Sequence, residues 1–102
     1  MISKKFLKSK PVCKVTFKLG KEEANGAKKV ALAGDFNEWN VAKKTEMKKL
    51  KNGSFTTTLD LEVGKNYEFR YVLDGTNWIN EAEADKYVPN GISYEENSVL
   101  AL

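Results

Sequence analysis

The chain contains no histidine and only one cysteine among its 102 residues. Histidine is the commonest general base and nitrogen ligand of metals, so its absence excludes Ser–His and Cys–His nucleophile pairs and leaves no ordinary zinc site. Cys13 stands alone, which rules out a disulfide within the chain, and its alternating context predicts a small buried hydrophobic residue. A glycine-rich phosphate loop is also missing. We therefore expect no cofactor, no metal and no enzymatic activity.

Long apolar runs are missing as well. No segment approaches the roughly 20 apolar residues of a membrane-spanning helix, and the basic N-terminus lacks the apolar centre of a secretory signal. With 2 prolines and 7 glycines, the sequence has no low-complexity linker. Its length fits one domain, which we expect to be soluble and cytoplasmic and to have no membrane partner.

Charge is moderate in amount but unevenly placed. The 17 basic and 14 acidic residues give a net charge of +3. Every charged side chain before the first acid, Glu22, is a lysine. We expect residues 1–11 to form a basic N-terminal arm and residues 12–102 to form a single domain. A basic arm can bind nucleic acid, but no motif supports that partner, so we favour a solvated and partly frayed end.

Alternation of apolar and polar residues dominates the rest of the sequence, with turn signals at Asn52-Gly53 and Asp74-Gly75. The expected strands are residues 13–19, 29–33, 47–51, 54–61, 67–73, 78–79 and 98–102, with a long loop at 80–96. Six to eight short, mainly antiparallel strands in about 100 residues predict an all-β, immunoglobulin-like sandwich. A small barrel is the alternative.

The clearest of these strands provides a first functional hypothesis. Tyr67, Phe69 and Tyr71 share the face expected in the core, so Arg70 points outward. We expect it to share one exposed surface with Trp78, which follows the next turn. A Trp ring can stack on the apolar C–H face of a sugar, and a guanidinium can donate paired hydrogen bonds to neighbouring hydroxyls. The alternative is structural: Trp78 caps the end of the sandwich, and Arg70 pairs with a nearby acid.

The segment Gly34-Asp35-Phe36-Asn37-Glu38-Trp39-Asn40 places two aromatic rings in a polar turn directly after an apolar strand. Each ring is either a plug in the core or a platform for stacking. We expect Phe36 to be the plug that anchors the turn and Trp39 to be the displayed ring.

The acidic residues near the C-terminus do not predict catalysis. Glu81, Glu83 and Asp85 alternate, and Glu95 and Glu96 are adjacent. A glycosidase needs two carboxylates that flank a cleft, and a sandwich of this size has little material for one. We therefore expect these acids to lie in a solvated loop.

Taken together, these motifs resemble family 48 carbohydrate-binding modules, also described as isoamylase N-terminal or early-set domains. The glycogen-binding domain of the AMP-activated protein kinase β subunit belongs to the same group. The matches in register are Gly34–Asn40, Met47–Leu50, Asn52–Phe55, Leu59–Leu61, Gly64, Tyr67–Tyr71, Leu73–Gly75, Trp78 and Asn97–Leu100. The resemblance covers nearly the whole chain, from about Val12 to the C-terminus.

The resemblance implies a non-catalytic module of the kind that accompanies glycoside hydrolases, here without the catalytic domain. The glycogen-binding members of the family stack α-glucan on two Trp residues, and Trp39 and Trp78 match them. A basic residue and an Asn also contact the sugar, and Arg70 and Asn97 stand at those positions. The implied carbohydrate-binding residues are therefore Trp39, Arg70, Trp78 and Asn97.

Two hypotheses of function follow. The first is a module that binds glycogen, starch or maltooligosaccharide, and that also contacts a glucan-metabolising protein. The second is a standalone early-set module that binds a protein and has lost sugar binding; buried Trp39 or Trp78 would favour it. The chain departs from the kinase domains in the loop before the last strand, where Ile92 or Tyr94 is the candidate for the missing apolar contact.

Overall fold

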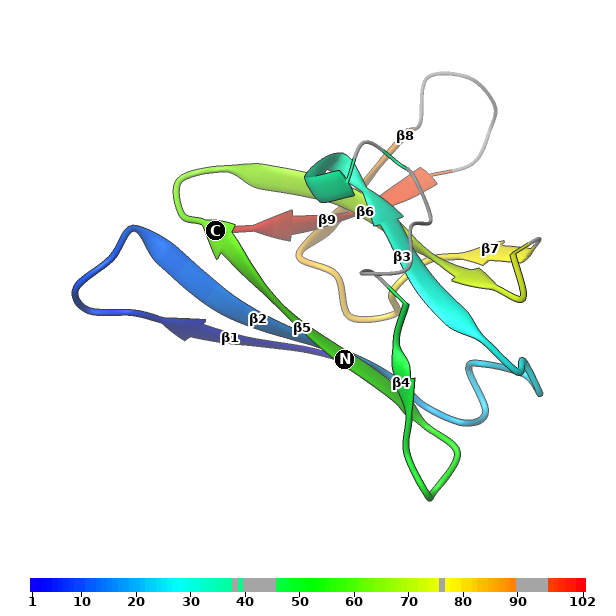
Figure 1. The fold of residues 1–102 in the computed structure, drawn as a ribbon. Coiled ribbons are helices and arrows are strands. Elements are labelled where there is room, and N and C mark those ends of the chain that lie inside the picture. Colours follow the sequence, from blue (N-terminus) through cyan, green and yellow to red (C-terminus); the bar gives the residue numbers. More distant parts are fainter. Residues whose placement is uncertain (38, 40–45, 76, 90–95) are drawn as a thin grey trace.

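Two antiparallel β-sheets form the two layers of the computed structural model of the chain (Figure 1). The structure describes residues 1–37, 39, 46–75, 77–89 and 96–102. Its elements are β1 (Ile2–Phe6), β2 (Val12–Leu19), β3 (Val30–Gly34), the 3-10 turn η1 (Asp35–Asn37), β4 (Lys48–Lys49), β5 (Phe55–Glu62), β6 (Asn66–Leu73), β7 (Asn77–Ile79), β8 (Lys86–Pro89) and β9 (Glu96–Ala101). Within the described ranges, a search for helices with the length and hydropathy of a membrane span finds none.

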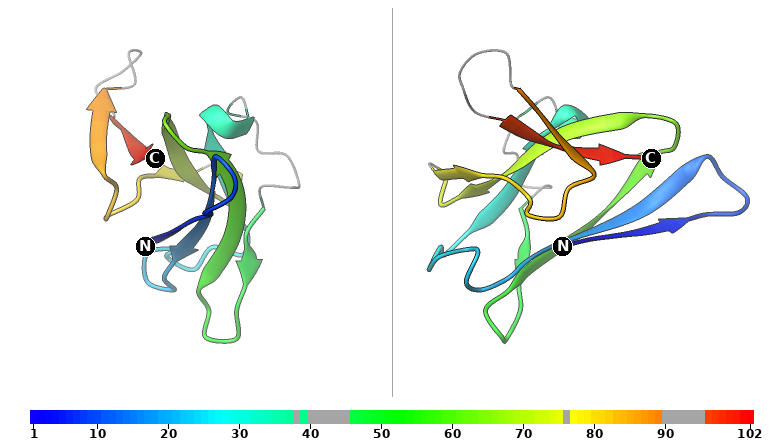
Figure 2. Two further views of the ribbon diagram at one scale, coloured as in Figure 1. Left: turned by 90° about the vertical axis from the view of Figure 1, so that its left-hand side faces the viewer. Right: turned by 180° about the vertical axis from the view of Figure 1, so that it is seen from behind.

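The first sheet, sheet A, has the strand order β1-β2-β5-β4, and the second, sheet B, has the order β3-β6-β9-β8, with β7 also paired to β6. Figure 2 shows the two layers from two further sides. All strand pairs in the described part of the chain are antiparallel. The predicted all-β sandwich is confirmed, with nine strands in the described residues instead of six to eight.

The core lies between the sheets and follows the alternation of the sequence. On β6, Tyr67, Phe69, Tyr71 and Leu73 face the core, as predicted. The inner face of β2 consists of Cys13, Val15, Phe17 and Leu19, all fully buried. Because burying one large apolar side chain stabilises a fold by roughly 1.5–3 kcal/mol, this two-sided set accounts for much of what holds the sheets together.

The sequence does not predict two of the strands. β1 occupies the segment expected to be frayed, and it pairs with β2 along its whole length. A contact with the residue before β8 holds it: Lys4 Nζ donates to Asp85 Oδ2 at 2.7 Å, across 81 positions of sequence. β8 occupies part of the expected loop at the edge of sheet B, where Pro89 is tolerated because an edge strand needs fewer backbone donors. Neither β1 nor β8 shows a strong alternating pattern in its own sequence, because each depends on pairing with another segment.

Candidate functional site

The turn after β3 is anchored by a glycine and a phenylalanine. A Cβ at Gly34 would lie 2.5 Å from the carbonyl oxygen of Glu68 and 2.7 Å from Cβ of Phe69, so only glycine allows β3 to end this close to β6. Phe36 then packs on the core, with its ring centroid 6.1 Å from that of Phe17 and 6.5 Å from that of Phe69. Phe36 is the predicted plug.

Hydrogen bonds close the same turn around Trp39. The Gly34 N–H donates to Asn37 Oδ1 at 2.9 Å, and Asn37 Nδ2 donates to the Leu32 carbonyl at 3.0 Å. The Trp39 N–H donates to the Gly34 carbonyl at 2.9 Å. Trp39 has a φ of 61°, in the left-handed region that residues with a side chain rarely adopt. Such a conformation costs of order 1–3 kcal/mol and persists because the surrounding bonds determine it.

Asp35 ties the Trp39 ring to the neighbouring strand. Its Oδ1 accepts the indole N–H of Trp39 at 3.1 Å, and its Oδ2 accepts the backbone N–H of Glu68 on β6 at 2.8 Å. The carboxylate therefore holds the edge of the indole while leaving its faces to other contacts. Sequence reasoning missed this role, although an Asp four residues before the Trp is visible within the motif.

The second Trp lies beside the first. Trp78 on β7 pairs with Val72 on β6, which places its side chain on the outer face of sheet B. The centroids of the Trp39 and Trp78 rings are 6.5 Å apart and their planes differ by 23°. Trp78 is 40% exposed and Trp39 is half-buried. Neither ring is buried, and together they form a surface that we call the Trp platform.

A polar row adjoins the Trp platform on the same face of sheet B. Phe69 pairs with Ser98, so the next residues on β6 and β9, Arg70 and Asn97, approach each other. Arg70 Nε donates to Asn97 Oδ1 at 2.9 Å, and Asn97 Nδ2 donates to Glu68 Oε1 at 3.1 Å. Glu68 therefore orients the Asn97 amide. Alternation along β6 places Glu68 on the same face as Arg70, but the hypothesis drawn from the sequence did not include Glu68.

The expectation for Arg70 is therefore correct in direction but wrong in exposure. Its side chain leaves the outer face, opposite the core residues Phe69 and Tyr71, yet the residue is only 6% exposed and Asn97 only 8%. The physical reason is that Arg70 lies on a strand with neighbours on both sides and extends along the sheet to Asn97. The Trp platform is the accessible part of the site. Ile92 and Tyr94, the candidates for a further apolar contact, lie outside the described residues.

Comparison with known protein families matches residues 22–94 to the glycogen recognition site of AMP-activated protein kinase. The chain belongs to this family. The match covers well over half of the sequence and includes the turn at Gly34, Trp39, Arg70 and Trp78, whereas Asn97 follows it. The predicted resemblance to the kinase glycogen-binding domain is confirmed at the level of the family. A comparison with curated proteins gave no match.

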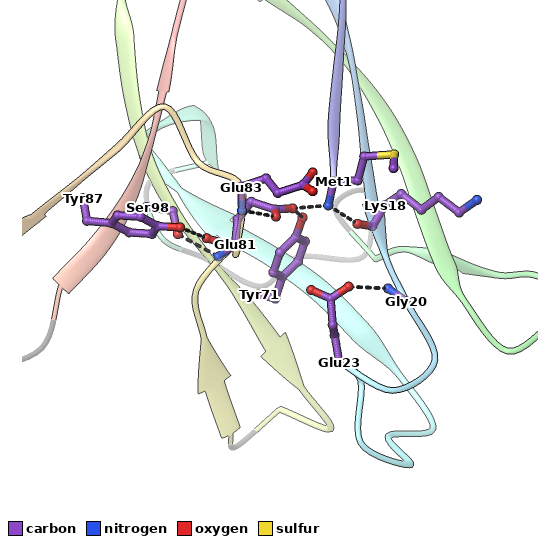
Figure 3. A network of polar contacts seen from close by, with 9 residues as sticks. All are labelled: Met1, Lys18, Gly20, Glu23, Tyr71, Glu81, Glu83, Tyr87 and Ser98. Atoms are coloured by element: carbon purple, nitrogen blue, oxygen red, sulfur yellow. Dashed lines mark hydrogen bonds and ion pairs between the residues drawn. The ribbon is translucent and has the colours of Figure 1, made fainter.

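One acid of this glycogen-recognition domain, Glu81, lies at the centre of a network of polar contacts (Figure 3). Glu81 is fully buried, which corrects the expected solvated loop for this residue. Glu83, Asp85 and Glu96 are exposed, as expected, and Glu95 lies outside the described residues. Glu81 Oε1 accepts the Tyr71 hydroxyl at 2.7 Å and the N-terminal ammonium of Met1, and its Oε2 accepts the Glu83 N–H at 2.8 Å. These donors allow the carboxylate to be buried, because a buried charge needs partners that replace water. Alternation alone could not reveal partners so distant in sequence.

The same contacts set the ionisation of the cluster. Burial raises the pKa of the Glu81 carboxyl, but hydrogen bonds from the N-terminal ammonium, Tyr71 and Glu83 outweigh burial and hold that pKa below its ordinary value. Burial, followed by the bond to Glu81, raises the pKa of the Tyr71 hydroxyl far above its ordinary value. Across the described residues, no group of three or more acids or cysteines is placed to hold a metal ion.

Proposed function

We propose that the chain is a non-catalytic α-glucan-binding module in which Trp39 and Trp78 stack on neighbouring sugar rings. The observation that carries this proposal is the Trp platform, where two partly exposed rings are stacked with their centroids 6.5 Å apart and their planes differing by 23°. Glycogen recognition by the family gives the class of ligand. Glycogen, starch and maltooligosaccharides share the α-linked glucose units that two such rings can contact.

Stacking on an aromatic ring contributes roughly 1–3 kcal/mol, by analogy with nucleic-acid bases. Association itself costs about 4 kcal/mol or more. Two rings and a few hydrogen bonds therefore give dissociation constants on the order of mM to tens of μM for short oligosaccharides. The bond from Asp35 to Trp39 favours the stronger end of this range, since a ring that is already ordered loses less entropy on binding.

In this proposal, Asn97 and Arg70 act as a pair at the edge of the Trp platform. The Asn97 amide is oriented on one side by Arg70 and on the other by Glu68. Because Arg70 is 6% and Asn97 8% exposed, sugar hydroxyls reach the pair only at its edge beside the rings, and the main contribution of Arg70 is to position Asn97. We assign residues 12–102 to the module, to which β1 adds an edge strand. A cytoplasmic location and a glucan-metabolising protein partner belong to the same proposal.

A protein-interaction module that has lost sugar binding is the competing hypothesis. Burial of Trp39 or Trp78 would support this hypothesis. Both rings retain accessible surface instead. The sugar hypothesis is therefore preferred, and the two differ in a direct measurement.

Titration with maltoheptaose, followed by calorimetry and by amide NMR shifts, tests the proposal. We expect Trp39→Ala and Trp78→Ala to weaken binding about 5- to 150-fold each, the range that 1–3 kcal/mol per ring gives. Phe6→Ala is the matched control, because Phe6 is an exposed aromatic residue on β1 of the other sheet. Absence of any response in the wild-type chain at mM sugar would refute glucan binding.

A further inference from the structure

A second feature of the outer face of sheet B is a hollow of about 440 Å³ between the start of β3 and the end of β6. We call it the β3–β6 hollow. Its lining residues are Lys28, Lys29, Val30, Ala31, Glu46, Val72, Asp74 and Gly75. Val30 and Val72 are buried beneath the hollow and Ala31 is partly exposed, whereas Lys29, Glu46 and Asp74 carry charged groups. Its volume falls within the range of about 300–1,000 Å³ that small-ligand sites occupy, and the hollow is open to solvent on one side.

The β3–β6 hollow adjoins the Trp platform. Ala31 on β3 pairs with Val72 on β6, and Val72 pairs with Trp78 on β7, so the three residues form one row across neighbouring strands. Side chains directly opposite each other in a sheet share a face and touch. Along β6, Arg70 lies on one side of this row and Asp74 on the other. A ligand on the Trp platform therefore has the polar row at one end and the hollow at the other.

Backbone contacts build both walls of the hollow. Asp74 Oδ1 accepts the backbone N–H groups of Lys28 at 2.9 Å and Lys29 at 3.0 Å, and the Asp74 N–H donates to the Lys29 carbonyl at 2.9 Å. On the opposite side, Glu46 forms a β-bridge with Ala31. The hollow is therefore formed before any ligand arrives, which lowers the ordering cost of binding.

We propose that the β3–β6 hollow is a further subsite that takes the glucose units beyond those on the Trp platform, in the same α-glucan chain. This inference rests on the proposed function. The apolar floor suits the C–H face of a sugar ring. The Lys29 ammonium can donate to sugar hydroxyls and the Glu46 carboxylate can accept from them. The continuity with Trp78 through Val72 favours the continuing glucan over an unrelated ligand.

Comparison of maltotriose with maltoheptaose by calorimetry tests the subsite, because only the longer chain can span both places. We expect wild-type affinity for maltoheptaose to exceed that for maltotriose by about tenfold, equivalent to about 1.4 kcal/mol. Ala31→Ile should fill the floor of the hollow and remove most of this difference while leaving maltotriose binding unchanged. The β-branched side chain suits a strand, so folding should be retained.

Lys29→Met and Glu46→Gln change only the rim and serve as independent variants if Ala31→Ile unfolds the chain. We expect each to reduce the maltoheptaose advantage about two- to fivefold. Lys18→Met is the matched control, since Lys18 is an exposed lysine on β2 of the other sheet. In amide NMR spectra of the wild type, Ala31 and Val72 should shift with maltoheptaose and far less with maltotriose.

The outcomes separate this inference from the function on which it rests. If Trp78→Ala abolishes binding of both sugars while the hollow variants keep the full chain-length advantage, the subsite is wrong and the glucan-binding function stands. The same conclusion follows if wild-type affinity is equal for the two sugars. If the wild-type chain binds neither sugar, both proposals are overturned.

Discussion

Removal of the Asp35 carboxylate should weaken glucan binding through Trp39. In Asp35→Ala, the indole N–H of Trp39 and the backbone N–H of Glu68 both lose their acceptor. Hydrogen bonds to a charged acceptor contribute roughly 1.5–3 kcal/mol when shielded, and these two lie near solvent. We therefore expect the free energy of unfolding to fall by about 1–2 kcal/mol, which leaves the domain folded.

The effect on affinity has a different size and cause. The Trp39 ring is ordered in the free chain by its bond to Asp35; without that bond, the sugar must order it. Immobilising a side chain on binding costs about 0.5–1.5 kcal/mol, so Asp35→Ala should weaken maltoheptaose binding about 2- to 10-fold. Calorimetry measures the affinity, and urea unfolding measures the stability of the same variants.

A double-mutant cycle with Trp39→Phe identifies the route of the effect. Phe keeps a stacking ring but has no N–H for Asp35 to accept. In the Phe background, Asp35→Ala should leave the affinity nearly unchanged but still lower stability, because the contact to Glu68 is lost in both backgrounds. Asp60→Ala is the control, since Asp60 is an exposed carboxylate on β5 of the other sheet.

An equal loss of affinity in the Trp and Phe backgrounds would contradict this reasoning. Asp35 would then act through the backbone of the turn and not through the indole. Unchanged affinity in Asp35→Ala, while Trp39→Ala abolishes binding, would also refute the claim that Asp35 positions the ring.

Three further predictions concern stability. Trp39→Gly should be more stable than Trp39→Ala by about 1 kcal/mol in urea unfolding, because glycine relieves the positive φ that both variants otherwise keep. Gly34→Ala should lower the free energy of unfolding by about 1–3 kcal/mol, since its Cβ would meet the Glu68 carbonyl at 2.5 Å; equal stability would mean that β3 and β6 can separate without cost. Glu81 has a pKa below its ordinary value of 4.5, so its contribution is complete above that pH and is lost as the pH falls through the lower, folded-state value. Glu81→Gln should therefore lower the free energy of unfolding at neutral pH and reduce its dependence on pH below 4.5. An unchanged dependence on pH would show that ionisation of Glu81 is not its cause.

Much of the candidate site could be predicted from local pattern. The turn that starts at Gly34 contains a glycine required by the close approach of β6, a ring that packs on the core (Phe36) and a displayed ring (Trp39). The type of each residue can be recognised in the sequence alone. Alternation on β6 correctly placed Arg70 on the outer face. The fold class followed in the same way, since period-two patterns and the turns at Asn52-Gly53 and Asp74-Gly75 depend only on neighbouring residues.

Contacts between distant segments could not be predicted. The sequence pattern treated Glu81 as solvated, although its donors come from Met1, Tyr71 and Glu83. It placed Arg70 on an exposed surface, where the structure covers it beside Asn97. The strands β1 and β8 depend on partners at the edges of the two sheets, which local alternation does not specify.

The sequence by itself determined the sandwich, the family and the two Trp residues, because each is encoded by residue types at short, fixed spacings. Only the tertiary structure decided that the Trp39 and Trp78 ring centroids lie 6.5 Å apart and that Asp35 accepts the indole N–H of Trp39. It also placed the β3–β6 hollow beside Trp78. The reason is that these relations join β3, β6 and β7, and the pairing of strands sets the distances between them.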